Sequence, residues 1–144
     1  MPSTLLFLCT GNYYRSRFAE LYFNARAEEA GLDWRAESSG LATDRPHNNE
    51  GPLSNHAIEQ LARYGVNVEQ PQRYPQQVQE GNLAAAELII ALKETEHRPL
   101  LAERFPLWQD RVVYWHIHDL NVIGADEAMS GLVAELDQLL QQLA

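Results

Sequence analysis

The chain has 144 residues, a net charge of −9 and a single cysteine. The length suits one domain with a core of its own, and one cysteine excludes an internal disulfide framework or a multi-cysteine zinc site. The acidic balance argues against nucleic acid as a partner, because phosphate backbones are bound by basic surfaces. The apolar runs are too short for a signal-peptide core or a membrane span, so we expect a cytoplasmic protein without membrane contact.

The chain opens with a short apolar run, Leu5 to Leu8, that ends at Cys9. The run is too short for a helix and fits a strand buried on both faces. Five residues further on, Arg15 and Ser16 open a helical pattern with a predicted stop at Gly31. The spacing Cys-x5-Arg-Ser between a strand and a helix is typical of a loop that holds a phosphoryl group.

A phosphate-binding loop of this kind uses backbone amides and one arginine. The amides of a loop that enters a helix point inward, and the helix dipole adds positive potential there. Gly11 lets the backbone turn and approach an oxyanion closely, and Arg15 offers a planar fork to two phosphate oxygens. The same field favours the thiolate form of Cys9, the predicted nucleophile. We therefore predict that phosphate is bound by Thr10, Gly11, Asn12, Tyr13, Tyr14, Arg15 and Ser16.

Each part of this motif has a plainer interpretation when it is taken alone. A lone cysteine at the end of a buried strand is usually a small core residue. An arginine in the first turn of a helix is usually solvated. The two residues together, at this spacing and between these elements, favour the phosphate site.

Strands and helices alternate along the rest of the chain. Residues 34–39 predict a second strand. Residues 43–52 are polar and contain proline and glycine, which predicts a loop. Ser54 is the predicted N-cap of a helix that ends near Gly65. The Gln/Pro-rich residues 67–79 predict a long surface connection rather than a domain boundary.

The second half of the chain continues the alternation. A short helical turn over residues 82–87 leads into a strand over residues 88–92. A helix follows from Thr95, in which Pro99 is tolerated only within the first turn. Residues 112–115 predict a fourth strand. A long final helix has an apolar stripe made of Met129, Leu132, Val133, Leu136, Leu139, Leu140 and Leu143.

Four buried strands alternating with helices predict an α/β fold. We expect a single three-layer domain over residues 1–144, with a four-stranded parallel sheet flanked by helices on both faces. In such sheets ligands bind beyond the carboxyl ends of the strands. Cys9, Ser38 and Asp119 all follow or close predicted strands, so we expect them at one edge of the sheet. Asp119 is the candidate general acid.

The loop resembles that of the low-molecular-weight protein tyrosine phosphatase family, whose motif reads Cys-x-Gly-Asn-x-Cys-Arg-Ser. Cys9, Gly11, Asn12, Arg15 and Ser16 match this motif in place. The resemblance implies that Cys9 attacks phosphorus and forms a phosphocysteine, with Arg15 and the loop amides stabilising the charge.

The resemblance also implies two supporting roles. Ser38 would hydrogen-bond Asn12 and brace the loop, and Asp119 would protonate the leaving oxygen and then activate water. The chain departs from the family pattern at four places: Tyr14 replaces the second cysteine, Arg17 replaces a proline, Leu120 replaces the proline that usually follows the aspartate, and no histidine lies near Gln70.

We interpret the chain as a cysteine-dependent phosphatase that hydrolyses phosphotyrosine or related aryl phosphomonoesters, on a phosphorylated protein or a small aryl phosphate, without a cofactor. His116 and His118 have a spacing seen in metal sites, but the sequence indicates no further metal ligands beside them. We therefore predict no metal. Two alternatives stay open: a phosphate- or phosphoprotein-binding module that has lost turnover, and an arsenate reductase-like enzyme. The latter normally needs further cysteines. The sequence predicts neither the physiological substrate nor the oligomeric state.

Overall fold

The central strand of the sheet is β1 (Ser3–Cys9), whose last five residues are buried. The computed structural model describes residues 2–117 and 125–144. β1 lies between β2 and β3, and its apolar run is buried because helices cover both of its faces. The strand order is β2-β1-β3-β4 and every pairing is parallel, with β2 at Trp34–Gly40, β3 at Leu88–Ala91 and β4 at Val113–Tyr114.

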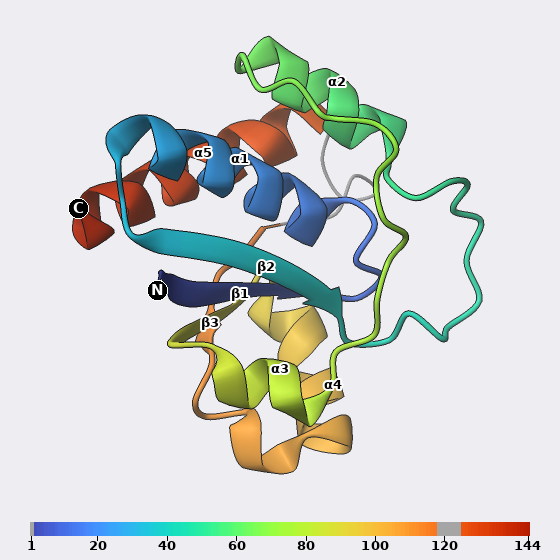
Figure 1. Cartoon of the computed structure of the whole chain (residues 1–144). Coiled ribbons are helices and arrows are strands. Elements are labelled where there is room, and N and C mark those ends of the chain that lie inside the picture. Colours follow the sequence, from blue (N-terminus) through green and yellow to red (C-terminus); the bar gives the residue numbers. More distant parts are fainter. Residues whose placement is uncertain (1, 118–124) are drawn as a thin grey trace.

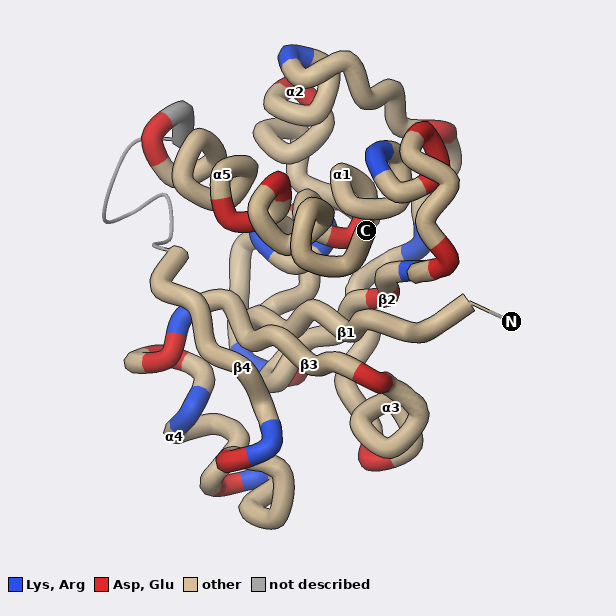
Figure 2. The backbone as a smooth tube through the Cα atoms, turned by 90° about the vertical axis from the view of Figure 1, so that its left-hand side faces the viewer, with Lys and Arg blue, Asp and Glu red and all other residues tan. Residues whose placement is uncertain are grey.

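Helices cover both faces of the sheet (Figures 1 and 2). On one face lie α1 (Arg15–Ala30), α5 (Ala125–Leu143) and α2 (Asn55–Arg63). On the other lie α3 (Glu80–Ala85), α4 (Glu94–Arg104) and the 3-10 helix η1 (Pro106–Trp108). The predicted α/β fold, with a four-stranded parallel sheet between helices, is therefore confirmed. None of the described helices is long and apolar enough to cross a membrane.

Alternate residues of β1 belong to two separate cores. Leu5 and Phe7 cluster with apolar residues of α1, α2 and α5. Leu6 and Leu8 point to the opposite face and cluster with residues of α3 and α4. The strand is thus held from both sides up to Cys9, where the chain leaves the sheet.

Several predicted element ends agree with the structure and others shift. α1 ends at Ala30, and Gly31, the predicted stop, is its C-cap in a left-handed conformation with φ 68. Ser54 occupies the N-cap position of α2, although its side chain makes no capping hydrogen bond to a described residue. The fourth strand is shorter than the predicted residues 112–115, and the short helix lies earlier than residues 82–87.

The position of Pro99 contradicts its prediction. It lies inside α4 and past the first turn. The helix begins early because the side chain of His97 accepts a hydrogen bond from the Lys93 N–H at 3.0 Å, while the His97 N–H donates to the Lys93 carbonyl at 2.8 Å. These bonds fix the start of α4 at Glu94, which places Pro99 beyond the first turn.

The connection over residues 67–79 is irregular apart from one bridge between Gln77 and Gly40. The Gly40 N–H donates to the Gln76 carbonyl and the Val78 N–H donates to the Gly40 carbonyl, both at 2.8 Å. These bonds hold the connection against the carboxyl end of β2, next to the loop that follows β1.

Candidate active site

Cys9 and α1 together form the floor of the candidate site. The Cys9 side chain is buried, and its Sγ lies 2.9 Å from Ser16 Oγ in the first turn of α1. Among the described residues, no side chain caps α1 and no acidic residue lies in its first turn. The positive end of the α1 dipole therefore lies beside the sulfur without an acidic side chain in the first turn to offset it.

The turn of the loop depends on Asn12 rather than on Gly11. Asn12 is fully buried with φ 51, a left-handed conformation that asparagine adopts more readily than most residues. Gly11 has no such φ, and a Cβ there would lie 3.8 Å from Asn49 Nδ2, so the left-handed residue of this loop is Asn12 and not Gly11. The close approach occurs at Gly40, where a Cβ would lie 2.8 Å from the Thr10 carbonyl oxygen.

The side chain of Asn12 ties the loop to its neighbours. Its Nδ2 group donates to Ser16 Oγ at 2.8 Å and to Ser38 Oγ at 2.9 Å. The second of these is the bond that the family resemblance implied. Ser38 donates in turn to Glu20 Oε1 at 2.5 Å. The side chains of Asn12 and Ser16 thus lie behind the loop and brace it.

A pocket of about 390 Å³ opens beside Cys9. Its loop side is lined by the predicted site residues Cys9, Thr10, Gly11, Tyr13, Tyr14 and Arg15. Its other walls are Ala42, Arg45, Pro46, His47 and Asn49 from the loop before α2, and Glu96 from α4. The Tyr13 hydroxyl donates to the Glu50 carbonyl at 2.6 Å, which fixes this ring at the mouth.

Arg15 is held by an acidic partner that the sequence analysis did not single out. Its Nη2 lies 2.6 Å from Glu96 Oε2, and its Nη1 donates to the Ile117 carbonyl at 3.3 Å. The same Glu96 oxygen accepts a hydrogen bond from Thr10 Oγ1. Glu96 therefore connects the loop after β1 to the first turn of α4.

The environment of Glu96 keeps its carboxylate ionised. Burial alone would raise the pKa of Glu96, but His97 Nε2 at 3.0 Å, the hydrogen bonds from Arg15 and Thr10, and the charge of Arg15 hold this pKa well below its usual range. Burial lowers the pKa of His97, so this imidazole is neutral next to the carboxylate. Glu96 thus places a carboxylate in the pocket, and this carboxylate is already paired with Arg15.

Asp119 and His118 lie outside the described residues. Ile117, which precedes them, receives the hydrogen bond from Arg15 and donates its own N–H to the Leu92 carbonyl at 2.7 Å. The segment that leads to Asp119 therefore contacts the loop arginine at its last described residue. Within residues 2–117 and 125–144, no group of three or more His, Cys, Asp or Glu side chains could hold a metal ion.

The sequence contained a signal for Glu96 but little for Arg73, another residue that contacts the loop. Glu96 follows the carboxyl end of β3, the edge at which a parallel sheet binds its ligands. Arg73 donates to Asn12 Oδ1 at 3.0 Å from a stretch without regular structure. Hydrophobic periodicity cannot indicate such a contact.

The Cys9 thiol lies at the end of a central parallel strand, and it shares one pocket with Arg15 at the start of α1. This arrangement assigns the chain to the cysteine-based phosphatases. The chain belongs to the family described as low molecular weight phosphotyrosine protein phosphatase, whose model matches residues 4–143.

Named relatives lie within the same family. A protein-arginine-phosphatase of Bacillus subtilis is 28% identical, with 97% of this chain and 93% of that protein covered. A low molecular weight protein-tyrosine-phosphatase of Streptomyces coelicolor is 32% identical, with 88% and 75% covered. The crystal structure of a low molecular weight protein tyrosine phosphatase from T. tengcongensis superposes with a TM-score of 0.79 at 28% identity, covering 98% of this chain and 99% of that one.

Proposed function

We propose that the chain hydrolyses phosphotyrosine or related aryl phosphomonoesters through a phosphocysteine intermediate. The observation that carries the proposal is the presence of Cys9 and Arg15 in one pocket at the start of α1. Thr10, Gly11, Tyr13 and Tyr14 complete the pocket floor, and the backbone amides of the loop are the proposed phosphate ligands.

The reaction has two displacements at phosphorus. The Cys9 thiolate attacks in line, the P–S bond forms and the P–O bond to the leaving group breaks. Asp119 is the proposed acid that gives its proton to the leaving oxygen. Water then attacks phosphorus, its proton passes to the Asp119 carboxylate, and the P–S bond breaks to release inorganic phosphate. Arg15 stabilises the charge on the equatorial oxygens in both steps.

The pocket walls favour an aryl leaving group. Tyr13 and Tyr14 stand on the loop side, and Ala42 and Pro46 stand opposite. Aromatic and apolar walls suit a flat ring attached to the phosphate. We propose a phosphorylated protein or a small aryl phosphate as the substrate, no nucleic acid or membrane partner, no cofactor, and a cytoplasmic location, in which the lone cysteine stays reduced.

Phosphoarginine is a second candidate substrate. One specific observation favours it: the Glu96 carboxylate lines the pocket, where it could pair with a guanidinium leaving group. The Bacillus subtilis relative named protein-arginine-phosphatase gives this chemistry a precedent in the family. Against it, Glu96 is already engaged by Arg15 and Thr10.

The test compares the release of phosphate from p-nitrophenyl phosphate, a phosphotyrosine peptide and phosphoarginine. We expect the aryl esters to turn over and Cys9→Ser to abolish that turnover while inorganic phosphate still binds. Faster release from phosphoarginine would select the second candidate. Phosphate binding without turnover of any substrate would refute the enzyme and leave the binding module.

A further inference from the structure

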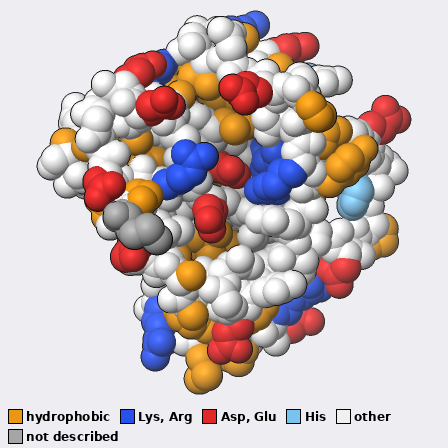
Figure 3. All heavy atoms as spheres, viewed as in Figure 1, with side chains coloured by type: hydrophobic (Ala, Val, Ile, Leu, Met, Phe, Trp, Pro, Cys, Tyr) orange, Lys and Arg blue, Asp and Glu red, His pale blue; other side chains and the backbone are white. Residues whose placement is uncertain are grey.

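Arg73 approaches the phosphate loop from behind, out of the connection over residues 67–79. Its Nη1 group donates to Asn12 Oδ1 at 3.0 Å. Its Nη2 group donates to the Ser38 carbonyl at 3.0 Å and to Ser38 Oγ at 3.1 Å, and lies 3.2 Å from Glu20 Oε1. In Figure 3, basic and acidic side chains adjoin near the middle of the face that Figure 1 presents.

These donors fix the orientation of the Asn12 amide. Oδ1 accepts from Arg73 and from the Gln76 N–H at 3.1 Å, and both of these groups can only donate. If the amide were flipped, its own N–H groups would face the N–H groups of Arg73 and Gln76, and no hydrogen bond could form there. The Nδ2 group must therefore point to Ser16 and Ser38, where its two hydrogens are used.

The orientation of Asn12 in turn determines where the Ser16 proton goes. Ser16 Oγ accepts from Asn12, so its own hydrogen is left for the Cys9 sulfur at 2.9 Å. A sulfur that accepts this bond is stabilised as the thiolate. A chain of three hydrogen bonds therefore connects Arg73 to Asn12, Asn12 to Ser16 and Ser16 to Cys9.

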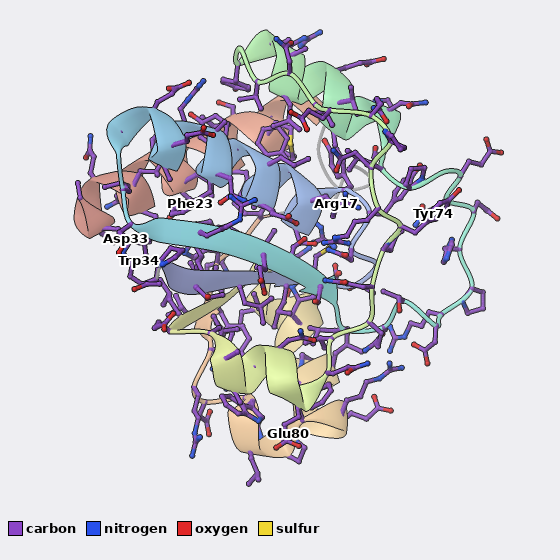
Figure 4. All side chains as sticks on the ribbon, viewed as in Figure 1. Arg17, Phe23, Asp33, Trp34, Tyr74 and Glu80 are labelled. Carbon is purple, nitrogen blue, oxygen red and sulfur yellow. The ribbon has the colours of Figure 1, made fainter. Side chains whose placement is uncertain are left out.

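Arg17 holds Arg73 in its place. The Arg17 side chain is almost fully buried, and it donates to the Arg73 carbonyl at 2.9 Å, to Gln72 Oε1 at 3.0 Å and to the Pro52 carbonyl at 3.1 Å. Figure 4 shows it between the start of α1 and the connection. Burial lowers the pKa of Arg17 and the charge of Arg73 lowers it further, whereas Glu20 and Cys9 act in the opposite direction.

We infer that Arg73 is a positioning residue: by orienting Asn12 it directs the Ser16 hydroxyl onto Cys9 and so favours the thiolate. The inference rests on the proposed role of Cys9 as the nucleophile. Nothing in it requires Arg73 to touch the substrate.

The test measures the alkylation of Cys9 by iodoacetamide between pH 5 and 9, followed by mass spectrometry. The thiolate is the reactive form, and Cys9 is the only cysteine, so the signal belongs to this residue. In Arg73→Met we expect the rate at pH 6 to fall about tenfold, the effect of losing one charge-assisted hydrogen bond. The rate at pH 9 should change little, because alkaline pH favours the thiolate form of cysteines in general.

Arg104→Met is the matched control. Arg104 also donates to a backbone carbonyl, that of Leu41 at 3.0 Å, and to a carboxylate, that of Asp44 at 2.9 Å. The substitution makes the same charge change with 27% of the side chain exposed, against 35% for Arg73. We expect this variant to keep the wild-type pH profile. Equal losses in both variants, or no loss in either, would overturn the inference.

The other charged groups around the loop are unchanged in these variants. From the helices they are Arg15, Arg17, Glu20, Glu96 and His97. From the loop before α2 they are Arg45 and His47.

Arg73→Lys keeps the charge but cannot reach Asn12 and Ser38 together, so we expect it to share the loss at pH 6. A wild-type profile in this variant would show that charge alone matters and would overturn the inference. It also carries the test if Arg73→Met does not fold. Because alkylation needs no phosphate ester, the result stands whether or not aryl phosphates are hydrolysed.

Discussion

Replacing Glu96 by Gln should cost stability in a way that depends on pH. The variant keeps the shape of the side chain but removes the charge that lies 2.6 Å from Arg15 Nη2. Arg15 is buried and the Glu96 side chain is 31% exposed, so water screens this pair only in part. One charge-assisted hydrogen bond of this kind contributes about 2 kcal/mol, which is the loss in free energy of unfolding that we expect at pH 7.

The sign of the pH dependence follows from the lowered pKa of Glu96. In the unfolded chain a glutamate titrates at about pH 4.3, whereas the folded pair keeps the carboxylate ionised to lower pH. The stabilisation is therefore complete above that pH and is lost as the pH falls below it. The difference between wild type and Glu96→Gln should shrink from pH 4 toward pH 2.

Urea unfolding from pH 2 to pH 8 measures this difference, and Glu94→Gln supplies the control. Glu94 lies in the same helical turn and pairs with Arg98 at 2.9 Å, but both side chains are 38% exposed. A surface pair of this kind contributes about 0.5 kcal/mol. A loss in Glu96→Gln no larger than that of Glu94→Gln, or one that does not change with pH, would refute the reasoning.

Four further predictions concern the loop and its chemistry. Arg15→Lys should lower kcat/KM for p-nitrophenyl phosphate about a hundredfold, because a point charge cannot replace the bidentate fork; wild-type turnover would contradict this. Gly40→Ala should cost about 1–3 kcal/mol in urea unfolding, since its Cβ would lie 2.8 Å from the Thr10 carbonyl oxygen. Asp119→Asn should slow the phosphorylation step more for alkyl than for activated aryl phosphates in single-turnover measurements, and equal losses would point to another acid. Peroxide should inactivate Cys9 beyond thiol rescue sooner than in a relative with both loop cysteines, because the chain offers no second thiol; full rescue after long exposure would argue against it.

The local part of the site could be predicted from the sequence. The apolar run before Cys9 and the helical spacing after Arg15 are signals within one short stretch, and they placed a strand, a loop and a helix correctly. The expected bond between Asn12 and Ser38 is present because Asn12 lies in the loop that follows β1, and Ser38 lies near the carboxyl end of β2, the strand paired with β1. The fold followed from the alternation of strands and helices.

The contacts that complete the site could not be predicted in the same way. Glu96 meets Arg15 across 81 positions of sequence, and Arg73 meets Asn12 across 61. Neither residue belongs to a periodic pattern, so only the folded chain shows what it touches. Pro99 was misplaced for a related reason, since the start of α4 depends on the side chain of His97.

The irregular connection over residues 67–79 has a consequence for how this chain can vary. Surface segments without regular structure usually accept insertions and deletions. Here a deletion of one residue would displace Arg73 and Gln76 from Asn12, and would separate the segment from the end of β2 at Gly40. We expect a scan of single insertions to be harmful across this segment and mild across residues 43–52, which wall the pocket. Changes of substrate range would then arise in the loop before α2, while the Gln/Pro-rich segment stays fixed in length.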